Sequence, residues 1–279
     1  MTFAPSLLQR HFEPASQLWQ VNREMALLLA GGRALLMQLA HPKVAAGVAA
    51  HSDFEKDPLG RLHRTMGSMW AIIFDEFDHA GAVLQRIEAV HRRVQGTVPG
   101  SGAGAGDSYR ALDQDLLLWV HATLIDSALA AYDLFVAPLT KIERQNYYID
   151  SQKLASLFRI DETMIPETLE SFQQYLSTTL QSGEVLPSTT AKRLARSILY
   201  PRPWMLRPAG PLFRLLTAGL LPESLRRNYE LQWDAGREAR YRRAAKAIRI
   251  LRPLIPRPLR LVPNARRAEK KIRRTVRSS

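Results

Sequence analysis

The sequence predicts an all-α fold, built as a single-domain bundle of many helices. Apolar residues recur at three- and four-residue spacing through most of the chain, as they do on the buried faces of helices. Runs in which β-branched residues alternate with polar ones are scarce. The 279 residues are 46% hydrophobic and 23% charged, which is enough to bury one sizeable core. We expect an N-terminal extension over 1–16, a helical domain over 17–262 and a basic tail over 263–279.

Proline, glycine and capping residues place the helices at the start of the chain. Pro42 and Pro58 suit the first turn of a helix, where a missing N–H is tolerated. Asp57 is a favourable N-cap for the second of these helices. The pair Gly31 and Gly32 is expected to interrupt the first apolar segment. The predicted helices span 17–40, 42–51, 58–77 and 83–98.

A glycine-rich stretch at 97–106 separates these helices from longer ones. Glycine alternates there with small residues, which predicts a flexible loop that either gates a site or is an inert linker. Asp107 or Ser108 is expected to cap the next helix, and Thr140 with Glu143 forms a capping box for the one after it. The predicted helices span 107–135, 140–158 and 161–181.

The chain contains no cysteine, which excludes disulfides, thiolate-bound zinc, Cys-ligated iron–sulfur clusters and a thiol nucleophile. Any metal chemistry must therefore use His, Asp or Glu side chains. The first residues lack the apolar segment of a signal peptide, and no unbroken apolar stretch reaches the ~18 residues of a membrane span. We therefore expect a cytoplasmic protein.

The net charge of +13 is concentrated at the C-terminal end. Residues 237–279 contain 16 Lys and Arg against two acids, so the rest of the chain is close to neutral. Such a segment is either a solvated basic face or a peripheral contact with an anionic membrane. Nucleic-acid binding is disfavoured, because no aromatic residue follows Tyr241 to stack on bases.

All seven histidines lie within the first 121 residues, so we expect the chemistry in the first half of the chain. His91 is predicted in the middle of a helix, on an apolar face with Ile87. His121 has the same setting between Leu117 and Leu124. A core histidine satisfied by a hydrogen bond is the simpler interpretation of either residue alone. Two inward histidines on successive helices favour a site.

The predicted helix after Asp57 carries a polar stripe that contains Arg61, Arg64 and Thr65 at helical spacing. This stripe is either a solvated face or a set of donors for an acidic cofactor or a bound oxygen species. The opposite face is apolar. We expect an apolar pocket lined by Leu36, Met66, Met69, Leu117 and Leu124.

Several ordered motifs carry a resemblance to a known family. They are Gly32-Arg-Ala-Leu-Leu-Met-Gln-Leu-Ala-His-Pro, His51-Ser-Asp-Phe, Asp57-Pro-x-x-Arg-Leu-x-Arg-Thr, His91-Arg-Arg-Val-Gln-Gly, Tyr109-Arg-Ala-Leu-Asp and Leu118-Trp-Val-His-Ala-Thr-Leu. Over about residues 20–265 the chain resembles the MpaB-type oxygenases, which share their catalytic domain with the latex-clearing proteins. The resemblance implies an all-α domain that binds haem b and cleaves isoprenoid double bonds with dioxygen.

The resemblance also assigns roles to single residues. It makes His91 the haem-iron ligand, and it places Arg61, Thr65 and His121 near the haem. Arg64 stands where the latex-clearing branch has a lysine, and a guanidinium is a poor haem ligand. Arg64 is therefore expected to leave a distal site open and to donate hydrogen bonds there. The latex-clearing branch has a glutamate that is proposed to act as a base, and Glu55 is a candidate for it by rough position only.

Two alternatives remain open from the residues themselves. The repeats Glu76-x-x-His79 and Glu88-x-x-His91 have the spacing used by di-iron sites in helical bundles. That site needs the two repeats to face each other from different helices, which a separation of 12 residues does not favour. The other alternative is a non-catalytic helical protein, binding haem or docking through its basic end. The preferred function is a haem b-dependent oxygenase with dioxygen and a small hydrophobic substrate.

Overall fold

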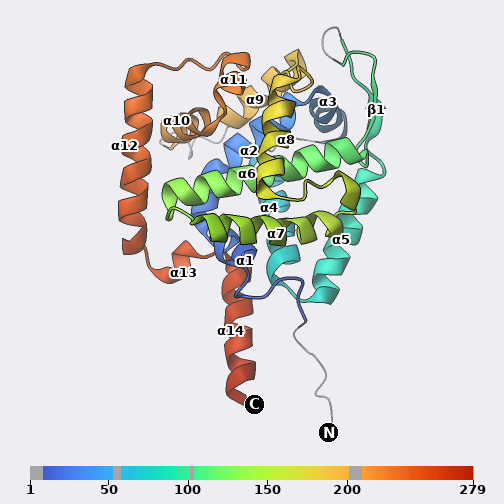
Figure 1. The fold of residues 1–279 in the computed structure, drawn as a ribbon. Coiled ribbons are helices and arrows are strands. Elements are labelled where there is room, and N and C mark those ends of the chain that lie inside the picture. Colours follow the sequence, from blue (N-terminus) through green and yellow to red (C-terminus); the bar gives the residue numbers. More distant parts are fainter. Residues whose placement is uncertain (1–8, 53–57, 101–103, 201–208, 279) are drawn as a thin grey trace.

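Helix α6 (Gln114–Phe135) is apolar around most of its circumference, and it therefore lies in the middle of the molecule. The computed structural model describes residues 9–52, 58–100, 104–200 and 209–278 (Figure 1). Helix α7 (Lys141–Leu157) covers one side of α6, and α2 (Gly31–Ala40) packs on another. The fold is all-α, as the sequence predicts.

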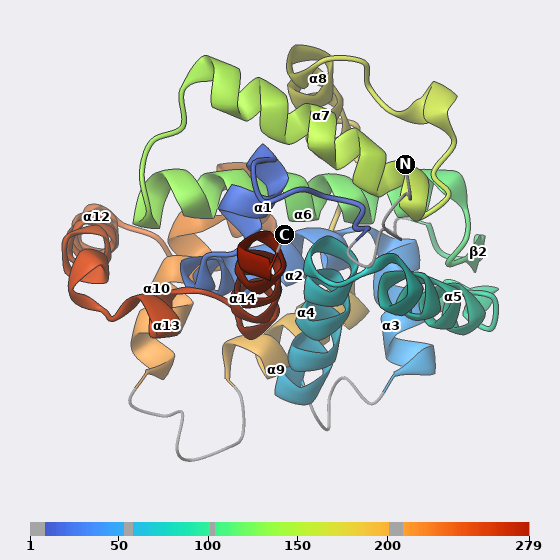
Figure 2. The ribbon, with the colours of Figure 1, turned by 90° about the horizontal axis from the view of Figure 1, so that it is seen from below.

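The remaining elements surround this centre, and Figure 2 shows their arrangement from below. They are α1 (Gln17–Asn22), η1 (Met25–Ala30), α3 (Pro42–His51), α4 (Pro58–Phe74), α5 (Phe77–His91), β1 (Gln95–Thr97), β2 (Ser108–Arg110), η2 (Glu162–Met164), α8 (Leu169–Gln181), α9 (Thr189–Leu199), α10 (Gly210–Leu220), α11 (Glu223–Asn228), α12 (Ala235–Leu251), η4 (Arg252–Leu254), α13 (Arg257–Arg260) and α14 (Pro263–Ser278).

The core is built around large side chains from helices far apart in the sequence. Trp19 on α1 meets Phe74 at the end of α4 edge to face, with ring centroids 4.8 Å apart. Trp119 and Phe135 on α6 are almost fully buried, as is Tyr147 on α7. This packing ties the N-terminal helices to α6 and α7.

Several predicted boundaries are wrong for local reasons. The predicted break at Gly31 is present, since η1 ends at Ala30 and α2 begins at Gly31, but the segment also breaks after Asn22, where α1 ends. Gly32 lies against the side chain of Thr217 on α10. The glycine-rich stretch joins two short strands, β1 and β2, which pair antiparallel; of its residues, 101–103 lie outside the described part. Because β2 occupies 108–110, α6 starts later than predicted, after Asp113.

The second half agrees better with the sequence. The predicted capping box is present: Thr140 accepts a hydrogen bond from the backbone of Glu143, and the Glu143 carboxylate accepts one from the backbone of Thr140. Asp161 opens only the short helix η2, and α8 is capped instead by Thr168. Among the described residues, no helix is both long and apolar enough to cross a bilayer.

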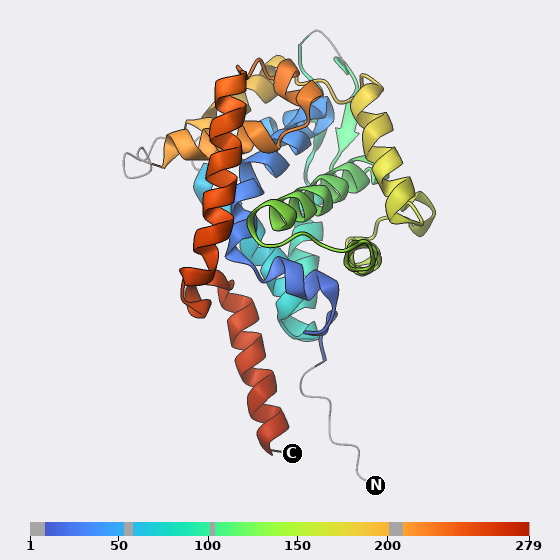
Figure 3. The same ribbon diagram turned by 60° about the vertical axis from the view of Figure 1, so that its left-hand side comes forward.

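The basic C-terminal end is helical. Helix α12 runs along one side of the molecule, and α14 packs on α4 through Ala265 and Ala268 before extending away from the body (Figures 1 and 3). Asn264 donates hydrogen bonds to Asp75, and Lys271 pairs with Glu76. The start of the basic segment is thus part of the packed body.

Candidate functional site

An apolar pocket lies where α1, η1, α2, α4, α6 and α7 meet, and its cavity volume is about 70 Å³. This volume is smaller than the roughly 300–1,000 Å³ of most small-molecule sites, so a ligand larger than a few atoms needs the lining side chains to move apart. Met66, Met69 and Leu124 line it, as predicted. Leu36 and Leu117 do not, because both pack into the hydrophobic core. The lining residues are Asn22, Leu27, Ala30, Gly31, Ala34, Met66, Met69, His121, Leu124, Ile125, Ser127, Ala128, Tyr147 and Leu154.

His121 is the histidine in this lining, and it projects inward from the second turn of α6, as predicted. Its side chain is buried, with 7% of the residue exposed. Burial lowers the pKa of His121 to about 4, and a hydrogen bond to the backbone of Ser151 on α7 opposes this only in part. The imidazole is therefore neutral at physiological pH, and a neutral imidazole is the form that ligates iron or accepts a proton.

Tyr147 and Asn22 contribute polar groups that the sequence reasoning did not identify. The Asn22 side-chain amide donates a hydrogen bond of 3.3 Å to the Tyr147 hydroxyl, and both residues line the pocket. Burial raises the pKa of Tyr147, so its hydroxyl keeps its proton. The sequence gives little indication that Tyr147 is buried, because α7 consists mostly of polar residues. These two residues and His121 give one pocket wall its hydrogen-bonding capacity.

A buried arginine supports another part of the wall. Arg33 on α2 donates a hydrogen bond of 2.8 Å to the carbonyl of Leu220 and one of 2.6 Å to the hydroxyl of Ser127. It also forms an ion pair with Asp126. Since Ser127 lines the pocket, this network fixes α2 against α6 beside the cavity. Arg33 belongs to the motif that begins at Gly32, and its role here is structural.

His91 is not in the middle of a helix, which corrects the prediction. It is the last residue of α5, because the chain turns after it to form β1. It is half-buried, and its neighbour Val90 is 55% exposed. The lining of the apolar pocket includes His121 but not His91. The structure therefore gives the two histidines different surroundings.

The polar stripe on α4 lies on a different face from the pocket. Arg64 and Thr65 are exposed, whereas Met66 and Met69 reach the pocket. The side chain of Arg61 lies outside the described residues, as does Glu55. Helix α4 thus carries its predicted donors and its predicted apolar contacts, but on separate sides.

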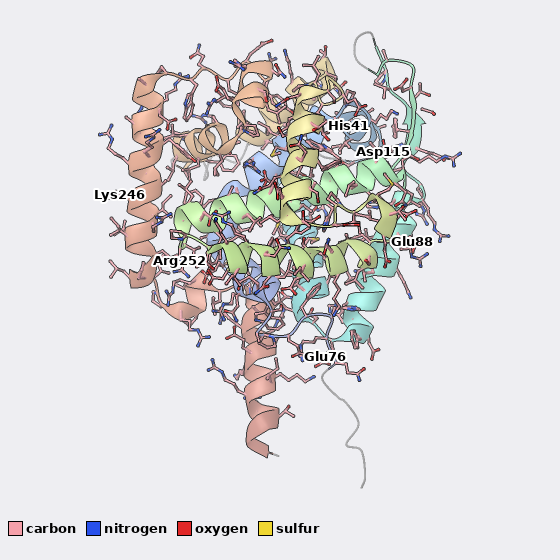
Figure 4. The ribbon with its side chains drawn as sticks, viewed as in Figure 1. His41, Glu76, Glu88, Asp115, Lys246 and Arg252 are labelled. Atoms are coloured by element: carbon pink, nitrogen blue, oxygen red, sulfur yellow. The ribbon has the colours of Figure 1, made fainter. Side chains whose placement is uncertain are left out.

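The two Glu-x-x-His repeats cannot face each other. Both belong to one helix: Glu76 caps α5, and Glu88 lies in its last turn, about 18 Å further along the axis. Figure 4 shows the two glutamates at separate places on the surface. Glu76 pairs with Arg10 and Lys271, and Glu88 pairs with Arg92 and Arg159. The carboxylates are thus engaged in separate ion pairs.

A metal site without a porphyrin needs several His, Asp or Glu side chains close together. Among the described residues, no group of three or more of these side chains could hold a metal ion. His79, one member of the repeats, forms a bond of 2.8 Å with Asp75 on the surface. His41, in the first motif, accepts a hydrogen bond of 3.3 Å from the backbone of Lys43 and so caps α3.

The fold and the pocket define an all-helical protein with an apolar cavity and one buried, neutral histidine. A family model described as "ER-bound oxygenase mpaB/B'/Rubber oxygenase, catalytic domain" matches residues 18–250. The chain belongs to this family, which confirms the resemblance carried by its motifs. Searches of curated proteins and of solved structures found no significant match.

Proposed function

We propose that this chain is a haem b-dependent oxygenase that acts with dioxygen on a small hydrophobic substrate of isoprenoid type. The observation that carries the proposal is the apolar pocket around His121 in a member of this oxygenase family. A cytoplasmic location is part of the same proposal and has its support in the sequence alone.

The donor chemistry of the chain fits a haem. A porphyrin supplies four ligands to its iron, so the protein needs to provide only one or two axial groups. Two histidines are candidates, and neither requires a cluster of carboxylates. His121 is neutral inside an apolar lining, and His91 is half-buried at the end of α5. Haem, when bound, supplies the redox chemistry that activates dioxygen.

His91, the residue that matches the family motif, would hold the haem iron. His91 is the last residue of α5 and is half-buried there. On α4, Arg61, Arg64 and Thr65 provide guanidinium and hydroxyl donors for a haem propionate or for negative charge that develops on oxygen. These roles rest on the resemblance and on the side-chain chemistry.

The pocket around His121 is the proposed place for the hydrophobic part of the substrate. Its methionines adapt to irregular apolar shapes, and most of its other lining side chains are apolar. His121 can accept a proton at the pocket wall, because its pKa of about 4 leaves the imidazole neutral. Tyr147 keeps its proton and can donate a hydrogen bond to the substrate.

Two histidine variants test the division of roles. We expect His91→Ala to lose most bound haem, because the side chain that would hold the iron is removed. We expect His121→Ala to keep its haem but to lose at least tenfold in turnover of an isoprenoid substrate. Haem content is measured as the pyridine haemochrome per chain. The assignment is wrong if His121→Ala loses haem while His91→Ala retains the full spectrum.

His79→Ala is the matched control for both variants. The side chain of His79 is 61% exposed, it forms a hydrogen bond with Asp75, and it does not line the pocket, so removal of its imidazole leaves the pocket lining unchanged. Haem content and turnover of this variant are expected to equal those of the unmodified protein.

A further inference from the structure

The segment between α12 and α14 exposes an unusual number of large apolar side chains. Leu254 is 77% exposed and Leu259 68% exposed. Three more side chains in the same ten residues are exposed: Ile250, Leu251 and Ile255. An apolar group of this kind on one short segment marks an interaction site rather than ordinary surface. We call residues 250–259 the apolar turn.

The apolar turn is stiff and lies at a corner of the molecule. It consists of the end of α12, the short helix η4 and most of α13, and it contains three prolines. Figures 1 and 2 show α13 at the foot of α12, beside the start of α14. Prolines restrict the backbone, so the apolar side chains are presented with little loss of conformational entropy.

A basic groove adjoins the apolar turn, between α13 and α14. Five of the eight residues that line it are cations, and Glu269 is its single acid. Glu269 is already paired with Arg23 and Arg257. The lining consists of Arg257, Pro258, Leu261, Arg266, Glu269, Lys270, Arg273 and Arg274. The groove therefore has a large excess of positive charge for an incoming anion.

Further cations flank the same corner on α12. Lys246 is exposed on the outer side of this helix, as Figure 4 shows. Neither Lys246 nor Lys270 has an ion-pair partner among the described residues. Residues 237–279 carry a net charge of +14 in total. An apolar centre between cations is the pattern of a protein surface that lies in a membrane interface.

We propose that the apolar turn and the basic groove form one site for the surface of an anionic lipid bilayer. Leu254, Ile255 and Leu259 enter the acyl boundary, and the groove cations bind the phosphates of anionic headgroups. The proposal does not depend on haem or on the oxygenase activity. It accounts for both halves of the surface, since a bilayer offers apolar chains and anionic phosphates at adjacent depths.

A nucleic acid would satisfy only the cations. It offers phosphates but no apolar layer for Leu254 and Leu259. The segment also contains no aromatic side chain that could stack on bases. The charge and the apolar exposure together therefore favour the bilayer.

Vesicle flotation tests the site. The full-length protein is expected to bind vesicles of 70% phosphatidylcholine and 30% phosphatidylserine and to bind pure phosphatidylcholine far less. Lys270→Glu/Leu259→Ser is expected to lower the partition constant at least tenfold, since each cation near such a surface contributes roughly fivefold. The control Lys141→Glu/Ile142→Ser makes the same chemical change on α7, where Ile142 is 73% exposed, and is expected to bind normally.

A second measurement follows insertion directly. Because the chain has no cysteine, a single Leu254→Cys carries an environment-sensitive NBD dye, and Ile142→Cys provides the reference position. The emission of the dye at position 254 is expected to shift to the blue when anionic vesicles are added, and the emission of the dye at position 142 is expected to stay unchanged. The proposal is overturned if neither anionic vesicle binding nor the shift occurs, if both double variants bind alike, or if the protein prefers duplex or single-stranded DNA to these vesicles.

Discussion

The guanidinium of Arg33 on α2 donates a hydrogen bond of 2.6 Å to the hydroxyl of Ser127 on α6, at the wall of the apolar pocket. The side chain of Arg33 is 6% exposed, whereas its ion-pair partner Asp126 is 31% exposed. The buried partner of this pair is thus the cation. Removal of Asp126 would therefore leave a buried positive charge without its ion-pair partner.

We expect Asp126→Ala to destabilise the protein by about 3 kcal/mol, because it leaves a buried guanidinium without its counter-charge. The control is Glu223→Ala, which removes an ion pair with Arg227 whose side chains are 69% and 72% exposed. That pair is expected to contribute less than about 1 kcal/mol. Urea unfolding followed by circular dichroism measures both. Equal losses would contradict a structural role for the buried pair.

Two glycines give a prediction about helix packing. A Cβ at Gly32 would lie 2.2 Å from Oγ1 of Thr217 and 2.9 Å from Phe213, so Gly32→Ala is expected to destabilise the protein by about 1–3 kcal/mol. A Cβ at Gly67 on α4 meets nothing within 4 Å. Gly67→Ala is expected to stabilise by about 0.5–1 kcal/mol through helix propensity. Thermal unfolding of the two variants should therefore shift in opposite directions.

The buried histidine predicts a dependence of stability on pH. In the folded chain the pKa of His121 is about 4, and in the unfolded chain it is about 6.5. Between these values the unfolded chain binds more protons, so unfolding becomes easier as the pH falls. The stability that His121 contributes is fully present above about pH 6.5 and is lost towards pH 4. The full difference corresponds to at most about 3 kcal/mol.

His121→Gln isolates this effect. Burial also lowers the pKa of His11 and His41, and both residues remain in the variant. The difference in unfolding free energy between the two proteins should therefore change between pH 6.5 and 4. A difference that stays constant over this range would show that the imidazole of His121 titrates in the folded state as it does in water.

Substrate affinity is expected to fall when a larger side chain is placed in the pocket lining. Ala128 lines it and is partly buried, so Ala128→Phe fills space that the substrate is proposed to occupy. We expect affinity for a prenyl alcohol such as farnesol to fall about tenfold, with haem content unchanged. Ala247→Phe, at an exposed position on α12, is the control and should bind normally. Isothermal titration calorimetry measures both, and equal affinities would place the substrate elsewhere.

The sequence predicted the fold class and the inward direction of His121, because both depend on local periodicity. His121 lies well inside a long apolar helix, so its direction follows from its neighbours at three and four residues. Met66, Met69 and Leu124 were predicted as pocket residues for the same reason. Strong local patterns of this kind survive in the folded chain.

The misplaced features depend on contacts between distant segments. The end of α5 at His91 is set by the pairing of Gln95 with Arg110 across the glycine-rich stretch. The partners of Arg33 come from α6 and from the end of α10. Leu36 and Leu117 are as apolar as the pocket residues, and only tertiary packing assigns them to the core. Periodicity along one helix carries no information about these choices.

The electronic spectrum of the purified protein tests the central claim most directly. The protein is expressed with haem precursor and recorded oxidised, reduced, and reduced with carbon monoxide. A bound haem b with an open sixth position predicts a Soret band that moves on reduction and again with carbon monoxide, at about one haem per chain. A folded protein that shows no Soret band, even after addition of haemin, would contradict the proposed function.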